Sequence, residues 1–261
     1  MILGLGRMPP LVLVYHSVAE VARGHDPLGL VVPPKRFRAQ VENLRARGYE
    51  FVTVTDFAAR LSVSGPPNGV CALTFDDGTD DELVTILGEL GVPGTLFVCP
   101  GLLGEPYPWL RPQSGIRFMS EAVLRDVATL PFIEIGSHTN SHVDLSGASE
   151  DDAFRELSSS RHALESLLGV RVSSFAYPFF VYSAACPAAA KRAGYLCAVS
   201  GGGRGGWLPF ELQREQVARR DGRVSFALKS RGAGTVVHRS GLGRLALPVR
   251  SVVARLRPQT D

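Results

Sequence analysis

The chain has 261 residues, of which 45% are hydrophobic and 20% are charged, so it is long enough to bury the core of a single α/β domain. Its 28 lysines and arginines nearly balance its 25 aspartates and glutamates, and basic residues do not cluster with aromatic ones around the polar motifs. This composition argues against a nucleic-acid-binding protein. No apolar run approaches the ~20 residues that a membrane-spanning helix needs.

The first residues of the chain lack the pattern of a secretory signal peptide. Residues 1–8 are short and glycine-rich, Arg7 follows their apolar residues, and Leu11 to Tyr15 serves better as a first strand. We therefore expect a cytoplasmic protein. The four cysteines lack paired Cys-x-x-Cys spacing, which argues against a zinc knuckle or a disulfide scaffold. Cys71 and Cys99 lie in apolar strand patterns, where a free thiol behaves as a small buried hydrophobe.

Strand and helix patterns alternate along most of the chain. Apolar, β-branched and aromatic runs predict the strands, and helical spacing of apolar residues predicts the helices. The predicted strands are residues 10–15, 50–55, 70–75, 95–99, 132–136, 172–177 and 195–199, and the predicted helices are residues 37–48, 82–90, 120–130, 149–168 and 184–193. Such alternation is typical of a parallel β/α barrel. Residues 201–206 read as a glycine-rich loop without the pattern of a phosphate-binding loop.

Two polar clusters follow predicted strands. Asp76, Asp77 and Gly78 come directly after the strand at residues 70–75, and a Gly-Ser-His-Thr-Asn-Ser-His run follows the strand at residues 132–136. Polar residues at the carboxyl ends of parallel strands gather at one edge of the sheet, so we expect both clusters to face one cleft. Taken alone, the acidic run is also typical of a turn or a helix start.

Together the clusters supply two carboxylates and two imidazoles. A divalent cation can be held by two neutral imidazoles and one carboxylate, which leaves the second carboxylate free to take a proton. Histidines four residues apart could share one face of a helix, but Gly136 and Asn140 favour a loop. The sequence therefore predicts a mononuclear metal site with an acid/base group beside it.

The sequence resembles the polysaccharide deacetylases, the NodB-homology group also called carbohydrate esterase family 4. The family motif Thr-Phe/Tyr-Asp-Asp-Gly matches Thr74 to Gly78, and the motif His-Ser/Thr-x-x-His matches His138 to His142. The Arg-x-Pro-aromatic motif is matched in part by Ala176 to Phe179, and Val14 to Ser17 resembles the Tyr-His opening of one branch. The resemblance runs from about residue 11 to about residue 220.

This resemblance implies a fold and a set of roles. The fold would be a distorted, incomplete (β/α) barrel, to which we assign residues 1–235. Separately from the resemblance, a helical stripe of apolar residues with arginines around it predicts a basic amphipathic tail over residues 236–261. The implied metal ligands are Asp77, His138 and His142, around a divalent cation for which zinc is the first expectation and other ions stay open. The implied general base is Asp76, and the backbone amide of Phe179 would be the oxyanion donor.

Two positions depart from the family pattern. Ala176 stands where the family commonly has an arginine that orients the base, so another group must orient Asp76. The candidates are Arg204, Arg214 and Arg219, of which we favour Arg214 because it lies in the strand-like Leu212 to Val217. Phe180 stands where the branch usually has glycine, which predicts a bulkier and more apolar rim to the pocket.

Several residues keep two interpretations. His238 is a loose counterpart of the family's acid histidine or a surface residue, and His16 enters the cleft or is structural. Trp207 stacks on a sugar ring or packs on the surface. The tail at residues 236–261 docks on the barrel, which we favour, or rests on an anionic membrane.

The sequence thus predicts a metal-dependent hydrolase that removes an N-acetyl group from an acetamido sugar or a sugar conjugate, releasing acetate and a free amine. Without an export signal, a soluble, nucleotide-linked or lipid-linked sugar is favoured over an assembled wall polymer. Two alternatives remain: a hydrolase of a non-sugar amide or cyclic imide on the same metal site, and a catalytically weak sugar-binding barrel.

Overall fold

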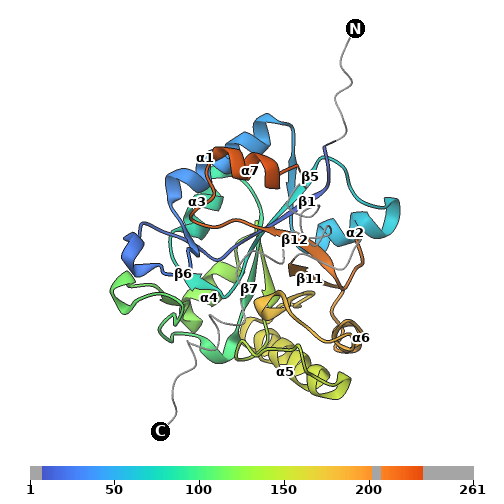
Figure 1. The fold of residues 1–261 in the computed structure, drawn as a ribbon. Helices are drawn as coiled ribbons and strands as arrows, with labels where there is room; N and C mark the ends of the chain where they lie inside the picture. The colour runs from blue at the N-terminus through green and yellow to red at the C-terminus, as the bar shows by residue number, and fades with distance from the viewer. Residues whose placement is uncertain (1–7, 202–206, 232–261) are drawn as a thin grey trace.

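Parallel strands close into a barrel in the computed structural model, which describes residues 8–201 and 207–231 (Figure 1). Within these ranges the ring has seven strands in the order β1-β12-β11-β10-β9-β7-β5, and β5 pairs back onto β1. The ring strands are β1 (Leu11–Tyr15), β5 (Val70–Phe75), β7 (Gly94–Val98), β9 (Ile133–Ser137), β10 (Ser174–Ala176), β11 (Cys197–Gly201) and β12 (Leu212–Gln216). An eighth parallel strand, β4 (Glu50–Val52), pairs with the start of β5 outside the ring. The predicted barrel is therefore confirmed.

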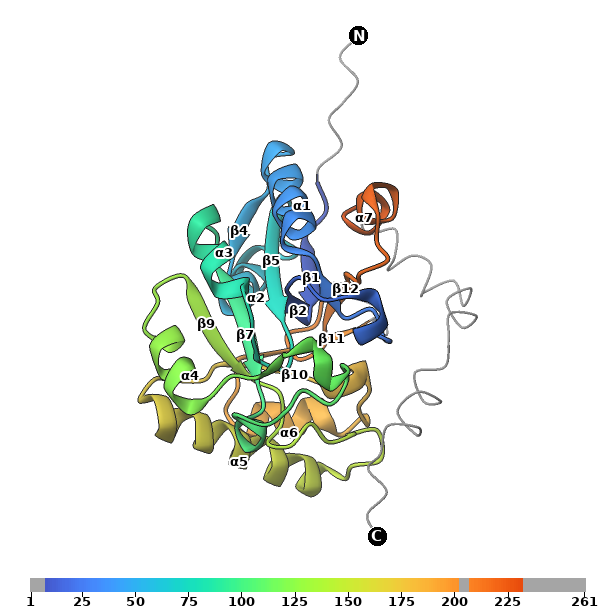
Figure 2. The same ribbon diagram turned by 90° about the vertical axis from the view of Figure 1, so that its left-hand side faces the viewer.

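The helices cover the outside and one end of this barrel (Figures 1 and 2). Neighbouring helices along the chain contact one another, as α4 does with α5 and α5 with α6. The helices are α1 (Pro34–Ala46), α2 (Val54–Ser64), α3 (Leu83–Leu90), α4 (Glu121–Ala128), α5 (Glu150–Leu168), α6 (Cys186–Arg192) and α7 (Arg223–Lys229), with 3₁₀ turns η1 (Arg23–His25), η2 (Pro100–Leu102), η3 (Pro112–Ser114) and η4 (Pro178–Phe180). Two small sheets, β2 (Ser17–Val18) with β3 (Val31–Val32) and β6 (Thr79–Asp80) with β8 (Arg117–Phe118), flank the carboxyl ends of β1 and β5.

Alternation along the strands sorts the core into two layers. On β5, Cys71, Leu73 and Phe75 belong to the large apolar cluster shared with the outer helices, whereas Val70 and Ala72 belong to a second cluster. The second cluster combines residues of β1, β7, β10, β11 and β12 with the buried face of α2. Because side chains alternate along a strand, this second layer is the interior of the barrel, and α2 closes its base.

A carboxylate fastens α2 to the barrel wall. Glu134 on β9 accepts hydrogen bonds from the backbone amide and the hydroxyl of Thr55, at 3.1 and 2.6 Å. The hydroxyls of Thr95 and Ser174 donate to the same carboxylate from the neighbouring strands. The first turn of α2 is thereby tied to three ring strands.

Most of the predicted elements are confirmed, one strand needed correction, and α2 was missed. The predicted strand at residues 50–55 ends at Val52, because Thr53 accepts a hydrogen bond from the Asp56 amide and starts α2. The β-branched residues of α2 concealed its helical pattern. No helix in the described ranges is long and apolar enough to cross a membrane. The predicted tail at residues 236–261, with His238, lies outside the described residues.

Removing the carboxylate at the barrel base should destabilise the fold. In Glu134→Ala, the hydroxyl and amide groups that donate to the carboxylate lose their acceptor. We expect the free energy of unfolding to fall by about 2–3 kcal/mol. Urea unfolding measures this loss. The control is Glu50→Ala, which removes only an exposed pair with Arg60 and should have a much smaller effect. Equal losses in the two variants would contradict the structural role of Glu134.

Candidate active site

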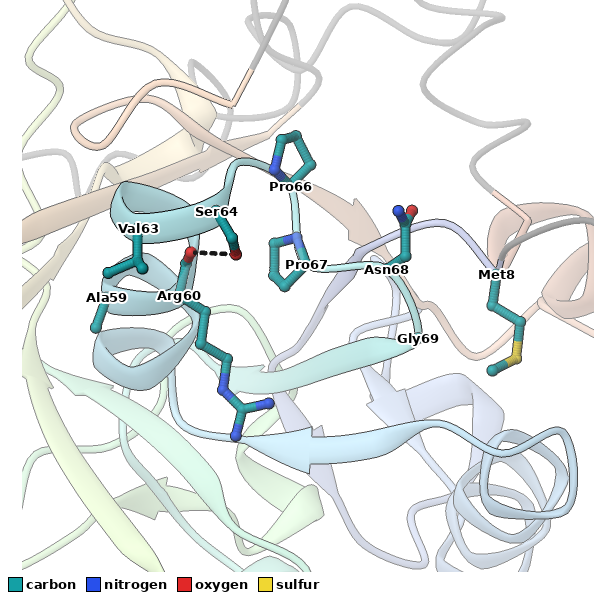
Figure 3. Close-up of a pocket in the computed structure, with 9 residues that line it drawn as sticks. All are labelled: Met8, Ala59, Arg60, Val63, Ser64, Pro66, Pro67, Asn68 and Gly69. Carbon is teal, nitrogen blue, oxygen red and sulfur yellow. Dashed lines mark hydrogen bonds between the residues drawn. The ribbon is translucent and has the colours of Figure 1, made fainter.

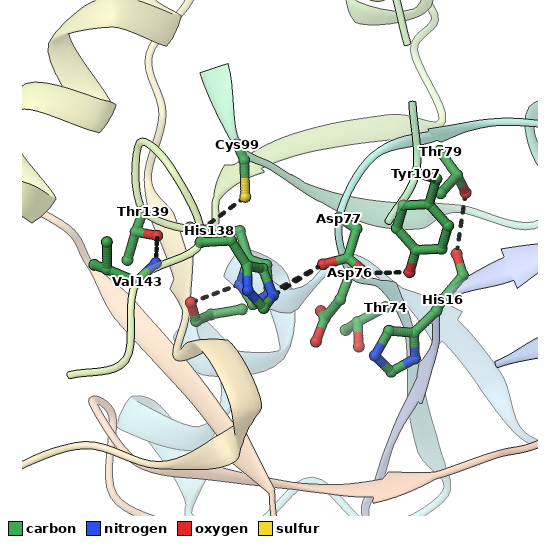
Figure 4. A network of polar contacts seen from close by, with 12 residues as sticks. His16, Thr74, Asp76, Asp77, Thr79, Cys99, Tyr107, His138, Thr139 and Val143 are labelled. Atoms are coloured by element: carbon green, nitrogen blue, oxygen red, sulfur yellow. Dashed lines mark hydrogen bonds and ion pairs between the residues drawn. The ribbon is translucent and has the colours of Figure 1, made fainter. Parts of the chain in front are cut away.

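Four strands carry the site residues at their carboxyl ends. His16 follows β1, Asp76 and Asp77 follow β5, His138 follows β9, and the turn η4 follows β10. Figure 4 shows the side chains of His16, Asp76, Asp77 and His138 near one another. The structure therefore brings both polar clusters together at this rim of the barrel, as expected.

Asp77, His138 and His142 form a three-residue cluster that fits a metal ion. The Nε2 atoms of His138 and His142 lie 3.5 and 3.2 Å from Oδ1 of Asp77, and the three ligand atoms are all within 4.8 Å of one another. No hydrogen-bond donor among the described residues reaches this Oδ1 atom. An unpartnered buried carboxylate oxygen facing two imidazole nitrogens is a donor set that suits a divalent cation.

The protonation states of this cluster also suit a metal. Nδ1 of His138 lies 2.8 Å from the Ala176 carbonyl and donates to it as N–H, so its Nε2 atom carries the lone pair. Burial lowers the pKa of His138 to about 4, which keeps the ring neutral at pH 7. Burial alone would raise the pKa of Asp77, but His142, His16 and His138 together hold it well below its ordinary value.

Asp76 turns away from this cluster and binds Arg214. The guanidinium of Arg214 donates from Nη1 to Oδ1 and from Nη2 to Oδ2 of Asp76, at 2.6 and 2.8 Å. Nη1 also donates to the hydroxyl of Thr74, and Nε donates to the Ser200 carbonyl. Burial opposes ionisation of Asp76, yet Arg214 and His138 lower its pKa below the ordinary value.

The other arginine candidates do not hold this carboxylate. Arg219 pairs with Asp26, at 3.4 Å, and donates to the Val21 carbonyl. Arg204 lies outside the described residues. The prediction that Arg214 replaces the arginine missing at position 176 is therefore confirmed as a contact.

Two aromatic residues at the site were missed from the sequence. The Tyr107 hydroxyl donates to Oδ2 of Asp77, and burial with the neighbouring Asp77 charge raises the pKa of Tyr107, so it keeps its proton. The Trp109 ring packs on His142, with 4.6 Å between centroids. Both lie in an irregular segment between β7 and β8. A Tyr-Pro-Trp run in such a loop was the available signal.

The backbone at the site is strained. Within the described ranges, the non-glycine residues with positive φ are Asp77, Thr139, His142, Phe179 and Phe180. All five lie in the loops that follow β5, β9 and β10. Bulky side chains rarely adopt this conformation, which costs of order 1–3 kcal/mol per residue and tends to be retained at functional sites.

The remaining predicted residues lie in different places. The Phe179 ring meets the His142 ring edge to face, with 4.4 Å between centroids, and its amide role stays a prediction. His16 lies at the site, and its Nδ1 atom has no hydrogen-bond partner among the described residues. Trp207 packs against Phe57 of α2, which supports the packing interpretation.

A partly buried carboxylate ties the His16 segment to the loop after β5. Asp81 accepts hydrogen bonds from the Val18 and Leu83 amides and from the hydroxyl of Thr79. Burial raises its pKa to about 6. The position of His16 relative to Asp76 and Asp77 is therefore fixed by bonds across two strand ends.

A surface hollow lies at the other end of the barrel. It lies between α2 and the amino ends of β1 and β5, beside Met8, Arg60, Val63 and Pro67 (Figure 3). None of the candidate catalytic residues lines it. This hollow is therefore separate from the candidate active site.

Comparisons with known proteins agree with this geometry. The family model described as polysaccharide deacetylase matches residues 64–198. The protein YxkH of Bacillus subtilis (strain 168), named for polysaccharide deacetylation, is 26% identical over 193 residues, which are 72% of this chain and 63% of that protein. The chain therefore spans less than two thirds of the length of this curated relative.

Solved structures share the fold. The Streptococcus pyogenes deacetylase PplD in complex with acetate is 22% identical, with a TM-score of 0.72 over 86% of this chain and 99% of that one. IcaB from Ammonifex degensii is 20% identical, with a TM-score of 0.69 over 85% and 95% of the two chains. At these identities the likeness shows the barrel fold.

The Tyr107 hydroxyl should strengthen metal binding. Tyr107→Phe removes the donor to Asp77 but keeps the ring, and we expect zinc affinity to fall by roughly 10- to 100-fold, as for other partners of metal ligands. Competition with a chromophoric chelator measures the affinity without any substrate. Tyr195→Phe, which removes a buried hydroxyl bonded to the Leu157 carbonyl, is the matched control and should keep its zinc affinity. Identical affinities in Tyr107→Phe and the wild type would exclude this role.

Proposed function

The chain belongs to the polysaccharide deacetylase family, and from that premise we propose that it is a metal-dependent N-deacetylase acting on an acetamido sugar of a glycan or glycoconjugate. One observation carries the proposal. The two adjacent carboxylates Asp76 and Asp77 have different partners, an arginine for the first and two imidazoles for the second. This arrangement provides a base and a metal ligand side by side.

Asp77, His138 and His142 would hold the cation, for which zinc is our proposal. When bound, a divalent cation polarises an amide carbonyl and makes a water molecule more acidic. The Ala176 carbonyl orients the His138 ring, and Tyr107 orients the Asp77 carboxylate. These contacts would set the geometry of the site before a substrate binds.

Asp76 would act as the general base. Its carboxylate is kept ionised by Arg214, so it is able to accept the proton of an attacking water near neutral pH. The bidentate contact also fixes the rotamer of Asp76, which limits the motion of the base. The Phe179 backbone amide would donate to the oxygen of the acyl group as negative charge develops on it.

His16 would donate a proton to the leaving amine. Its side chain faces the site in Figure 4, and its Nδ1 atom has no partner in the described part of the chain. Deacetylation produces an amine that leaves more readily when it is protonated. His16 would thus be the proton donor, from the end of β1, in place of the His238 counterpart suggested by the sequence.

Acetate release tests the proposal. Zinc-loaded protein incubated with N-acetylglucosamine oligosaccharides should release acetate and free amine. Asp76→Asn should keep its zinc and slow the release by ~10²-fold or more, whereas Asp77→Asn should lose most of its zinc. Elemental mass spectrometry measures the zinc content, and a coupled assay measures the released acetate. Together the two measurements distinguish the two roles.

Two outcomes would contradict the assignments. Zinc lost from Asp76→Asn and retained in Asp77→Asn would reverse the roles of the carboxylates. Zinc-loaded protein that releases no acetate from N-acetylated glycans, but hydrolyses a cyclic imide, would favour the alternative substrate class.

The pH dependence of kcat/KM tests Arg214, and the rate of acetate release tests His16. Without the guanidinium, burial raises the pKa of Asp76, so Arg214→Gln should move the acidic limb of the profile to higher pH. Arg214→Lys keeps the charge without the bidentate geometry, and it should move the limb less. Because His16 is the proposed proton donor, His16→Asn should lower the rate of acetate release.

Arg219→Gln is the matched arginine control, because Arg219 pairs with Asp26 and not with Asp76. Its acidic limb should coincide with that of the wild type. If the acidic limb of Arg214→Gln coincides with that of the wild type, Arg214 is excluded as the group that keeps Asp76 ionised.

A further inference from the structure

The guanidinium of Arg214 is covered by two phenylalanine rings. The nitrogen atoms at its edge donate the hydrogen bonds described above, to Asp76, Thr74 and Ser200. Its Cζ atom lies 5.6 Å from the ring centroid of Phe97 and 5.3 Å from that of Phe180. Both distances are within the ~6 Å range of cation–π contacts, and the side chain is fully buried.

A glycine makes room for each ring. A Cβ atom on Gly136 would lie 2.5 Å from two ring carbons of Phe97, and one on Gly201 would lie 2.4 Å from Cγ of Phe180. Gly201 is the residue of β11 that pairs in register with Arg214 of β12. Side chains of paired residues point to the same face of a sheet, so Gly201 leaves open the space beside Arg214 that Phe180 fills.

Phe180 occupies this space at a cost. Its φ of 60° is in the left-handed region, and Phe179 before it has a φ of 55°. Strain of this kind persists where surrounding contacts enforce it. Phe180 is only partly buried, so burial of apolar area accounts for less of its placement than it would for a core residue. This backbone brings the ring to Arg214, and the edge of the ring also meets the His16 ring, with 6.4 Å between the centroids.

We infer that Phe97 and Phe180 clamp Arg214, and that Phe180 is a positioning residue for Asp76 that acts through this arginine. The inference rests on the proposed function, in which Asp76 is the base. The rings hold the guanidinium plane, and the plane fixes both oxygens of the carboxylate. Gly201 belongs to the same device, because any side chain there would displace the Phe180 ring.

The test compares Phe180→Leu with Phe180→Tyr in the zinc-loaded full chain. Leucine keeps an apolar side chain but has no ring face, so kcat for acetate release should fall on the order of tenfold, with KM and zinc content unchanged. Tyrosine keeps the ring and should retain most of the rate. Gly201→Ala should reproduce the loss seen with leucine, and Gly147→Ala, whose new methyl group meets nothing within 4 Å, is the matched glycine control.

A second readout does not depend on activity. The Nε–H group of Arg214 should give a slowly exchanging, ring-shifted proton signal in nitrogen-correlated NMR spectra, present in the wild type and Phe180→Tyr. The signal should be lost in Phe180→Leu and in Gly201→Ala. If the wild type releases no acetate but the signals follow this pattern, the clamp stands and the proposed function falls.

The inference is overturned if Phe180→Leu keeps both the wild-type kcat and the Arg214 signal. It is also overturned if Phe180→Tyr loses as much as Phe180→Leu, because the ring face would then be irrelevant. Combining Phe180→Gly with Gly201→Ala supplies a check on mechanism. With the Phe180 ring absent, the added methyl group at position 201 should cause no further loss of kcat. Additive losses of kcat would contradict the inference that the ring and this methyl group compete for the same space.

Discussion

Two neighbouring buried carboxylates must both stay ionised, and the rest of the site depends on how this is achieved. Asp76 and Asp77 are adjacent and almost inaccessible to solvent. Without other partners, the negative charge of one buried carboxylate would raise the pKa of the other. The structure gives each its own partners: Arg214 forms an ion pair with Asp76, whereas two imidazoles and the Tyr107 hydroxyl contact Asp77. The positive φ of Asp77 accompanies this separation.

The barrel brings these partners together from distant parts of the chain. Parallel strands end at one rim, so residues separated by 138 positions, Asp76 and Arg214, meet there. The opposite end is closed by α2 and its contact with Glu134, which leaves the rim as the place where strained loops gather. At position 176, alanine stands in place of the arginine that the family commonly has, and Arg214 binds Asp76 instead. The side chain of Ala176 is only a methyl group, yet its carbonyl still orients His138.

The sequence predicted the strands that carry the site, because their apolar runs end in polar clusters. It also predicted Arg214, since a strand-like pattern surrounds an arginine where a partner for Asp76 was needed. Tyr107 and Trp109 were missed because their segment has no periodic pattern and reaches the site only through tertiary contacts. Phe180 was expected at the rim, but its contact with Arg214 depends on the register between β11 and β12, which no local pattern encodes.

A crystal structure of the protein with zinc bound tests the central claim most directly, namely that the two carboxylates have separate duties. The account predicts zinc on Asp77, His138 and His142, with Asp76 still held by both guanidinium nitrogens of Arg214. Zinc bound by both carboxylates, or Asp76 released from Arg214 when the metal binds, would contradict it.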